Sequence, residues 1–336
     1  MAAARRSALR VAVLMGGVSS EREISKKSGN AVVEGLTEAG HTALPMDITS
    51  EDITEVIQLE PDVAFIALHG RFGEDGGVQA MLEHAGILFT GSDSQASRWA
   101  MDKMASKCFF ISNEIPTPDF RVVMAPGWES EGAALDGAQR AGICPSLPEV
   151  IEELGLPVVT KPLREGSSVG VSVAHTLEEA EAGIAKAYRF GRQALVEAFI
   201  GGRELTVGVL GEEPLPIVEL VYAGKMFDFD AKYRAKTTRY IAGVDLGRHD
   251  TEKVQEIALQ AHNALGCSQL SRVDIRLDAG GQPYVLEVNT IPGFTSRSLF
   301  PMAAAAAGIE FPELCDRLVR DAVMARGEAR VSALAG

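Results

Sequence analysis

Residues 272–289, which read RVDIRLDAGGQPYVLEVN, decide the fold. Alternating apolar side chains on either side of the turn-forming residues 278–281 predict a β-hairpin with strands over 272–277 and 284–288. Successive side chains of a strand point to opposite faces, so Arg272 and Asp274 share one face. The pattern therefore predicts a sheet near the end of the chain that carries charged side chains on one face.

The same alternation places Glu287 and Asn289 on one face of the second strand. Together with Asp274 they supply two carboxylates and an amide, the hard oxygen ligands that suit Mg²⁺ and suit Zn²⁺ poorly. The alternative is a hairpin whose charged residues only meet solvent. Leu286 and Val288 alternate with the polar positions as in an internal strand, and this favours the metal site.

A second signal is residues 161–170, KPLREGSSVG, where a lysine at the end of a predicted strand precedes small residues. Backbone N–H groups of such a loop can approach an anion closely, as a phosphate clamp requires. Gly and Ser also fill ordinary loops, so this signal alone leaves that alternative open. The chain has neither the Gly-x-Gly-x-x-Gly spacing after its first strand nor a Gly-x-x-x-x-Gly-Lys-Ser/Thr motif. With the magnesium ligands, the loop predicts a metal–nucleotide site of another architecture.

The composition excludes several classes of protein. The 336 residues carry 46 acidic and 32 basic side chains, which gives a formal net charge of −14. Nucleic-acid and anionic-membrane binding rely on clustered cations, so neither partner is expected. The longest apolar stretches, such as 11–15 and 64–68, fall far short of the roughly 18 residues of a membrane span. Four widely spaced cysteines without a Cys-x-x-Cys pair predict ordinary thiols in a reducing cytoplasm.

The first hundred residues alternate strand and helix patterns, which predicts a small open parallel sheet. Ser20 and Glu23 have the spacing of a capping box that opens the first helix, and Gly40 is its expected end. A further helix is expected over 77–85. The expected strands are 9–15, 61–68 and 86–90.

The remaining chain predicts further sheets and helices. Residues 97–113 have a helical pattern, which prolines 116 and 118 end. Residues 125–148 predict an irregular connection with at most one helix. Besides the hairpin, the expected strands are 156–161, 171–174, 194–199, 204–210 and 214–221, and the expected helices are 176–189 and 251–265.

Seven segments in order resemble the D-alanine–D-alanine ligase family of the ATP-grasp superfamily, and the resemblance runs from about Val11 to Ala305. Any one segment could arise by chance, but seven at fitting intervals are very specific. The segments are residues 16–23 (GGVSSERE), 67–76 (ALHGRFGEDG), 101–103 (MDK), 161–170 (KPLREGSSVG), 231–233 (AKY), 272–274 (RVD) and 286–293 (LEVNTIPG).

The resemblance implies a three-domain ATP-grasp fold of the α/β class. Residues 1–97 would form an N-terminal open parallel sheet for the first substrate, and ATP would lie between a central domain over 98–191 and a C-terminal domain over 192–336. The implied reaction joins two D-alanines to D-alanyl-D-alanine, with ADP and phosphate, through an acyl phosphate for peptidoglycan precursor synthesis. The resemblance also implies two Mg²⁺ or Mn²⁺ ions and a homodimer.

The resemblance assigns roles at the nucleotide site to three groups of residues. Phosphates would be bound by Lys103 and Lys161, with Lys232 also at the ATP site. Two metal ions would be bound by Asp274, Glu287 and Asn289. Adenine and ribose would be bound by Glu197, Ala198, Phe199, Ile200 and Glu204.

For the substrates, the resemblance implies that Glu21 holds the ammonium of the first D-alanine and that His69 belongs to the same pocket. The alternatives are that Glu21 is an ordinary residue of the first helical turn and that His69 is a structural histidine. Ser167 and Tyr233 would link to Glu21 and close the segment 231–244 over the site. Arg272 and the Gly293 N–H would stabilise the tetrahedral intermediate. The Ser298 hydroxyl and the Leu299 N–H would bind the carboxylate of the second substrate.

The chain departs from the family pattern at three places. Residues 125–148 match no segment of the family. Residues 241–243 read Ile-Ala-Gly where the family generally has a Pro-Ala element near the end of the closing loop. Ala198 replaces a frequent lysine. One alternative for the function is the same chemistry with D-lactate or D-serine as second substrate, against which Tyr233 argues. The other is a nucleotide-binding regulator without turnover. The complete set of predicted polar site residues argues against it, namely Asp274, Glu287, Asn289, Arg272 and Lys161.

Overall fold

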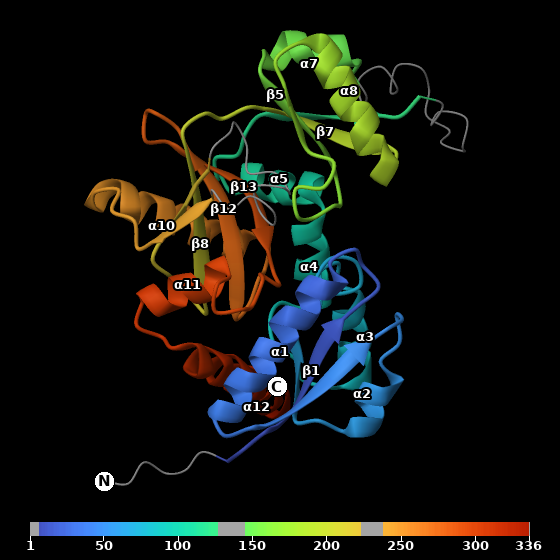
Figure 1. Ribbon diagram of the computed structural model, residues 1–336, viewed down its shortest axis with the longest axis vertical. Coiled ribbons are helices and arrows are strands. Elements are labelled where there is room, and N and C mark those ends of the chain that lie inside the picture. The colour runs from blue at the N-terminus through green and yellow to red at the C-terminus, as the bar shows by residue number, and fades with distance from the viewer. Residues whose placement is uncertain (1–6, 127–144, 223–237, 336) are drawn as a thin grey trace.

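The structure is a computed structural model that describes residues 7–126, 145–222 and 238–335. Three β-sheets organise this part of the chain (Figure 1). In the view of Figure 1 the N-terminal sheet lies at the bottom, the central sheet at the top, and the C-terminal sheet between them on the left. The parallel sheet comes first along the chain and the two antiparallel sheets follow it.

The N-terminal sheet is parallel, with strand order β2-β1-β3. Its middle strand is almost fully buried because helices cover both faces, as the continuous apolar run predicts. The elements of this unit are β1 (Arg10–Gly16), α1 (Arg22–Glu38), β2 (Thr42–Ile48), α2 (Thr54–Leu59), β3 (Val63–Ile66) and α3 (Gly77–Ala85).

Three sequence-based expectations for this unit were wrong. The capping box is not formed, because α1 has Glu21 as its N-cap and the neighbouring Ser19 hydroxyl donates instead to the His69 carbonyl at 2.6 Å. The strand β2 was missed because it is largely half-buried or exposed and contains a proline, so it lacks a clear apolar pattern. Residues 86–90 contribute one parallel bridge, Ala64 to Phe89, rather than a strand.

The central sheet is antiparallel in the order β4-β7-β5-β6, and α7 and α8 pack on one of its faces. The capping box of α7 is formed by Ser146 and Glu149. The elements are β4 (Phe120–Met124), α7 (Leu147–Leu154), β5 (Val158–Pro162), β6 (Ser172–Ala174), α8 (Leu177–Ala187), the 3-10 turn η2 (Tyr188–Phe190) and β7 (Gln193–Ala198). Of the connection expected over 125–148, residues 127–144 lie outside the described residues.

The C-terminal sheet has the order β11-β10-β8-β12-β13, with β9 paired to β8. The predicted hairpin is confirmed, since β12 and β13 pair antiparallel across residues 278–281. Helix α10 packs on one face and α11 contacts β8, β10 and β11. The elements are β8 (Arg203–Leu210), β9 (Glu213–Pro214), β10 (Val218–Val221), β11 (Arg239–Ala242), α10 (Arg248–Ala264), β12 (Leu270–Leu277), β13 (Pro283–Asn289) and α11 (Leu299–Ala306).

The helical stretch expected over 97–113 is two helices, α4 (Ser94–Met101) and α5 (Lys103–Ser112). Asp102 separates them in an extended conformation, and its side chain accepts hydrogen bonds from the first backbone N–H groups of α5. This break fixes Lys103 at the first position of α5. The last helix, α12 (Phe311–Ala335), returns to the N-terminal sheet and packs on α1.

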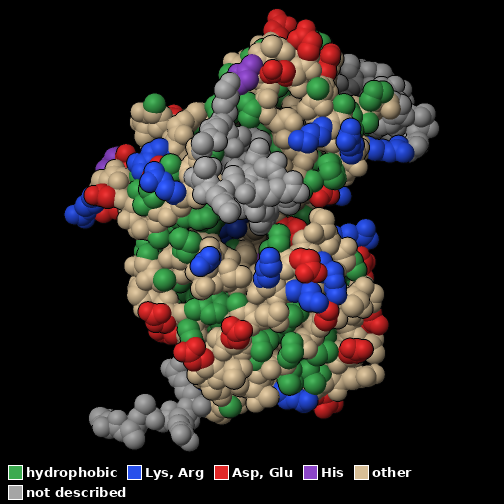
Figure 2. All heavy atoms as spheres, in the orientation of Figure 1, with side chains coloured by type: hydrophobic (Ala, Val, Ile, Leu, Met, Phe, Trp, Pro, Cys, Tyr) green, Lys and Arg blue, Asp and Glu red, His purple; other side chains and the backbone are tan. Residues whose placement is uncertain are grey.

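Figure 2 shows how the excess of acidic residues is distributed on one face of the molecule. Acidic side chains gather at the top, over α7 and α8, while acidic and basic side chains are interspersed lower down. In the described part of the chain, none of the helices has the length and apolarity that crossing a bilayer requires.

Candidate active site

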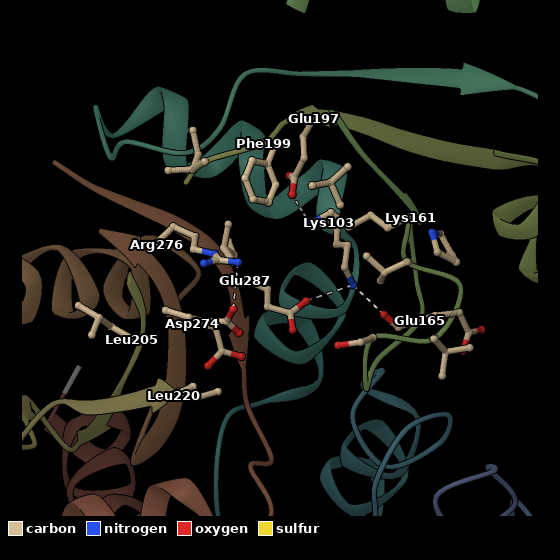
Figure 3. Close-up of a pocket in the computed structure, with 18 of the residues that line it drawn as sticks. Lys103, Lys161, Glu165, Glu197, Phe199, Leu205, Leu220, Asp274, Arg276 and Glu287 are labelled. Carbon is tan, nitrogen blue, oxygen red and sulfur yellow. Dashed lines mark hydrogen bonds and ion pairs between the residues drawn. The ribbon is translucent and has the colours of Figure 1, made fainter. Parts of the chain in front are cut away.

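A first cavity of about 970 Å³ lies between the central and C-terminal sheets (Figure 3). One wall comes from β5, β7 and the segments that follow them, and the other from β8, β10, β12 and β13. Phe199, Leu205 and Leu220 give it apolar surface, whereas charged groups gather around Lys103, Asp274 and Glu287. This combination suits a ligand with an aromatic ring at one end and negative charge at the other.

Glu197 is the most deeply buried charged group that lines this cavity, with 2% of its surface exposed. Lys161 forms an ion pair with Oε1, and Lys107 Nζ lies 3.0 Å from Oε2. Burial raises the pKa of Glu197, but the two lysines together lower it by a larger amount, so the pKa falls below its usual 4.5. A carboxylate oxygen has two lone pairs, so Oε2 can accept a further hydrogen bond in addition to its contact with Lys107.

Glu204 on β8 lies further along the same cavity. The Tyr222 hydroxyl donates to its Oε2 at 2.5 Å, and Arg276 lies 3.2 Å from the same oxygen. Burial and the Glu204 charge raise the pKa of Tyr222, so its proton is retained. Arg276 also lies over the ring of Phe199, with its Cζ atom 5.8 Å from the ring centre. These contacts fix Glu204 in the cavity wall.

The KPLREGSSVG loop connects β5 to β6 and reaches both this cavity and its neighbour. Ser167 and Ser168 have φ values of 49° and 57°, a region that non-glycine residues seldom adopt and that tends to occur at functional sites. Lys103 Nζ donates to the Glu165 carbonyl at 2.7 Å, and Ser167 Oγ donates to Glu21. Burial raises the pKa of Glu165. The loop is therefore tied to α5 through Lys103 and to the start of α1 through Glu21.

The hairpin pairs Asp274 directly opposite Glu287 and Arg272 opposite Asn289, so the predicted placement of these side chains is confirmed. Arg272 binds Asp274 through two nitrogens, at 2.8 and 2.7 Å, and Lys103 Nζ lies 3.3 Å from Glu287. No group of three or more His, Cys, Asp or Glu side chains that could hold a metal occurs in the described ranges. Two carboxylates and an amide nevertheless fit Mg²⁺, which usually binds one or two carboxylates together with waters and substrate phosphates.

A second cavity of about 1090 Å³ lies against the N-terminal unit. Glu21 at the start of α1 and His69 after β3 line one side of it. Glu74 Oε1 lies 3.2 Å from His69 Nδ1, which identifies Nδ1 as the protonated nitrogen because a carboxylate can only accept. Gly70 has a φ of 68°, and a Cβ there would lie 3.0 Å from Glu21 Oε2. The motif around residue 70 therefore needs glycine to bring these side chains together.

The opposite side of the second cavity is formed by the segment between β13 and α11. Gly293 lines the cavity, and Ser298 is the N-cap of α11, so the backbone N–H of Leu299 is at a helix N-terminus. Ser298 Oγ accepts from the Thr295 N–H at 3.0 Å. Backbone N–H groups at a helix N-terminus attract carboxylates, so this side suits the carboxylate of a small acid.

The two cavities share a wall, since five residues line both of them. A group bound in one cavity can therefore meet a group bound in the other at this wall. The shared residues are Lys103, Glu165, Arg272, Glu287 and Leu299.

All the predicted site residues in the described part of the chain line one of the two cavities. Lys232 and Tyr233 lie outside the described residues. The first cavity contains Lys103, Lys161, Glu197, Ala198, Phe199, Ile200, Glu204, Arg272, Asp274, Glu287 and Leu299, and the second contains Glu21, His69, Lys103, Ser167, Arg272, Glu287, Asn289, Gly293, Ser298 and Leu299.

Sequence reasoning missed five charged residues at the site, of which Lys107, Glu74 and Glu165 had a signal, the last because it lies within the predicted phosphate loop. Lys107 lies one helical turn after Lys103 on α5, so the spacing alone puts both on one face. Glu74 lies within a quoted motif, five residues after His69. Arg276, which contacts Glu204, and Arg297, which lines the second cavity, gave no signal that separates them from ordinary charged residues.

The fold and the joined cavities are those of an ATP-grasp enzyme, in which a nucleotide lies between two antiparallel sheets. Residues 110–320 match the family model described as D-ala D-ala ligase C-terminus, and residues 53–92 match D-ala D-ala ligase N-terminus. The chain belongs to the D-alanine–D-alanine ligase family. The predicted fold class, enzyme class and activity, ATP-dependent joining of two D-alanines for peptidoglycan synthesis, are confirmed.

Individual relatives agree over almost the whole chain. The D-alanine–D-alanine ligase of Gluconobacter oxydans is 42% identical over 321 residues, which cover 94% of this chain and 99% of the relative. That of Pelotomaculum thermopropionicum is 42% identical over 314 residues, covering 93% and 96%. The crystal structure of the Bacillus anthracis ligase complexed with ATP superposes with a TM-score of 0.80 at 30% identity, covering 96% of this chain and 100% of that one.

Proposed function

We propose that the reaction takes place where the two cavities meet, with ATP in the first cavity and both D-alanines in the second. The observation that carries this assignment is the wall of five residues that line both cavities. A phosphoryl group can pass from ATP to a carboxylate only if the two are within bonding reach. A shared wall provides that contact, whereas two separate pockets would not.

In the first cavity, Glu197 and the backbone of Ala198, Phe199 and Ile200 would bind adenine, and Glu204 would bind ribose. The unused acceptor position of Glu197 Oε2 suits an exocyclic amino group. Backbone recognition does not need the lysine that the family often has at position 198.

The phosphates would lie beside Lys103 and Lys161, with Lys232 also part of the ATP site. Lys103 Nζ sits between the Glu165 carbonyl and Glu287 (Figure 3). Cationic side chains at both positions would offset the charge of a triphosphate.

Two Mg²⁺ or Mn²⁺ ions would be bound by Asp274, Glu287 and Asn289. When bound there, such ions would offset the negative charge of the transferred phosphoryl group. The support is chemical, because all three donors are hard oxygens on the two paired strands of the hairpin, with Asp274 directly opposite Glu287.

In the second cavity, Glu21 would bind the ammonium of the first D-alanine, with His69 beside it. Ser167 donates to Glu21, and Tyr233 would extend this hydrogen-bonded set. The carboxylate of the bound D-alanine would then face Lys103 and Arg272, at the shared wall.

The reaction would follow in two steps. A carboxylate oxygen of the first D-alanine attacks the γ-phosphorus, ADP leaves, and an acyl phosphate forms. The neutral amine of the second D-alanine attacks the acyl carbon, and phosphate leaves as the peptide bond forms. Arg272 and the Gly293 N–H would stabilise the intermediate oxyanion. Ser298 and Leu299 would hold the second carboxylate, at the start of α11.

Product formation from ATP with D-alanine, D-serine, D-lactate and L-alanine tests the proposal. We expect ADP, phosphate and D-alanyl-D-alanine in equal amounts with D-alanine, and little product with L-alanine. A faster reaction with D-lactate or D-serine as second substrate would replace the substrate assignment, and ATP binding without D-alanine-dependent phosphate release would overturn the proposed activity.

Three further features implied by the resemblance belong to this proposal. The domains would be residues 1–97, 98–191 and 192–336, which assigns one sheet to each. The enzyme would act in the cytoplasm, which the free thiols of Cys108, Cys267 and Cys315 support. It would be a homodimer, which sedimentation equilibrium would test.

A further inference from the structure

Ser28 is a buried serine on α1 that lines neither cavity but contacts the walls of the second from behind. Its hydroxyl lies 3.0 Å from His69 Nε2, and it accepts a hydrogen bond from the backbone N–H of Phe294 at 3.2 Å. His69 belongs to the N-terminal unit, whereas Phe294 follows Gly293 in the segment after β13. One hydroxyl group thus joins two segments that line the second cavity, one through His69 and the other through Gly293.

These hydrogen bonds form one continuous chain. His69 Nδ1 donates to Glu74, because a carboxylate can only accept, and His69 Nε2 is hydrogen-bonded to the Ser28 hydroxyl. The Ser28 oxygen accepts from the Phe294 N–H. The chain of bonds runs from Phe294 through Ser28 and His69 to Glu74, and every member is paired.

Phe294 itself is held by packing. Its ring is buried and lies 5.3 Å from Phe65, 6.0 Å from Phe300 and 5.7 Å from Phe311. Aromatic packing fixes the ring but leaves the orientation of the preceding peptide to local hydrogen bonds. The bond to Ser28 fixes that peptide, which joins Gly293 to Phe294 and directly follows the Pro292–Gly293 peptide that carries the Gly293 N–H.

We propose that Ser28 is a positioning residue, which orients Gly293 for the tetrahedral intermediate and ties its orientation to His69. This inference rests on the proposed function, since Gly293 matters only if its N–H receives the oxyanion. Ser28 touches no substrate in this scheme. Its effect is on the geometry of a donor that acts mainly in the transition state.

Ser28→Ala tests the proposal through the split between kcat and KM. We expect kcat to fall by roughly 10- to 100-fold, because a misplacement of about 1 Å at a reacting centre can cost about 100-fold. The KM for ATP should stay the same, because the first cavity does not contact Ser28.

Ser25→Ala is a matched control, because Ser25 is an equally buried serine one turn earlier on α1. Its hydroxyl also makes two hydrogen bonds, from the Gly16 N–H at 2.8 Å and to the Ala67 carbonyl at 2.7 Å, but it does not contact the Gly293 segment. This control should lower the melting temperature to a similar extent while kcat stays near that of the wild type.

Two results would overturn the inference: kcat of Ser28→Ala equal to that of the wild type, or equal losses of kcat in both serine variants. If Ser28→Ala does not fold, Ser28→Cys keeps the side-chain volume while weakening both hydrogen bonds, and the same comparison applies. Absence of D-alanine ligation by the wild type would instead reject the proposed function.

Discussion

Two carboxylates of the first cavity, Glu197 and Glu287, are each paired with lysine but in contrasting surroundings. The side chain of Glu197 is 3% exposed and lies between two lysines that are themselves buried. The side chain of Glu287 is 33% exposed, and its lysine partner Lys103 lies at a longer 3.3 Å. A buried pair is held in place by its own charges, whereas a partly exposed pair separates more readily.

We propose that this difference separates a ligand-binding end of the cavity, at Glu197, from a chemical end, at Glu287. At the Glu197 end, fixed charges would give a preformed surface for the ligand. At the Glu287 end, Lys103 and Arg272 lie on carboxylates that we assign to metal binding, so these cations can turn towards phosphate once the carboxylates have other partners. Substitutions at the two ends should therefore alter different measured quantities.

Glu287→Gln should have the largest effect on turnover. We expect kcat to fall by at least about 1,000-fold, equivalent to roughly 4 kcal/mol, because a charge is lost from the proposed metal site. ATP binding, measured by calorimetry, should persist because the Glu197 end is intact. Activity like that of the wild type at saturating Mg²⁺ would show that Glu287 is not a metal ligand.

Arg272→Met should lower kcat by about 100- to 1,000-fold, the usual effect of removing one oxyanion donor. The KM for ATP should change much less, because the lost interaction forms mainly in the transition state. Steady-state kinetics with both substrates varied would separate the two constants. If the main change is a higher KM for ATP, Arg272 belongs to the binding end and the division drawn above is misplaced.

Glu197→Gln should lower the unfolding free energy and the affinity for ATP more than it lowers kcat. Its removal leaves Lys107 and Lys161 buried without a countercharge, which costs about 3–5 kcal/mol of unfolding free energy. Urea unfolding measures this loss, and Glu287→Gln is the control, with an expected loss below about 1 kcal/mol. Equal losses in the two variants would remove the contrast between the two ends.

The smallest expected effect is on how the unfolding free energy decreases at acidic pH. The folded chain holds the pKa of Glu197 below its usual 4.5, so the unfolded chain takes up this proton first as the pH falls. The corresponding stability is present above about pH 4.5 and is lost as the pH falls through the folded pKa. As the pH falls below 4.5, the unfolding free energy of Glu197→Gln should therefore decrease less steeply than that of the wild type. Equal slopes for the two proteins in this pH range would contradict the assignment.

The sequence predicted the hairpin, α3 and most of the later strands because their apolar patterns are strong. It failed where tertiary contacts decide the local structure. The strand β2 has no clear alternation and is held by pairing with β1. The predicted capping box of Ser20 and Glu23 is not formed, because α1 has Glu21 as its N-cap, and the preceding turn is held by Ser19, which donates to the carbonyl of His69. Such contacts join residues that are far apart in the sequence and cannot be inferred from either one alone.

The site followed the same division. Alternation along two strands was enough to place Asp274 opposite Glu287, but the remaining roles depended on the resemblance to a family. The links between distant segments, such as Ser28 to Phe294, had no local signal. The partner of a buried polar group is determined by packing, and the sequence shows only that the group exists.

The most direct test of the shared wall follows an oxygen atom across it. With D-alanine labelled with ¹⁸O in both carboxylate oxygens, an acyl phosphate formed at this wall must transfer one labelled oxygen to the phosphate that leaves. Mass spectrometry of the released phosphate should find one ¹⁸O for each dipeptide formed. Phosphate without ¹⁸O would show that the carboxylate never attacks the nucleotide, and would contradict the account that the two cavities form one reaction site.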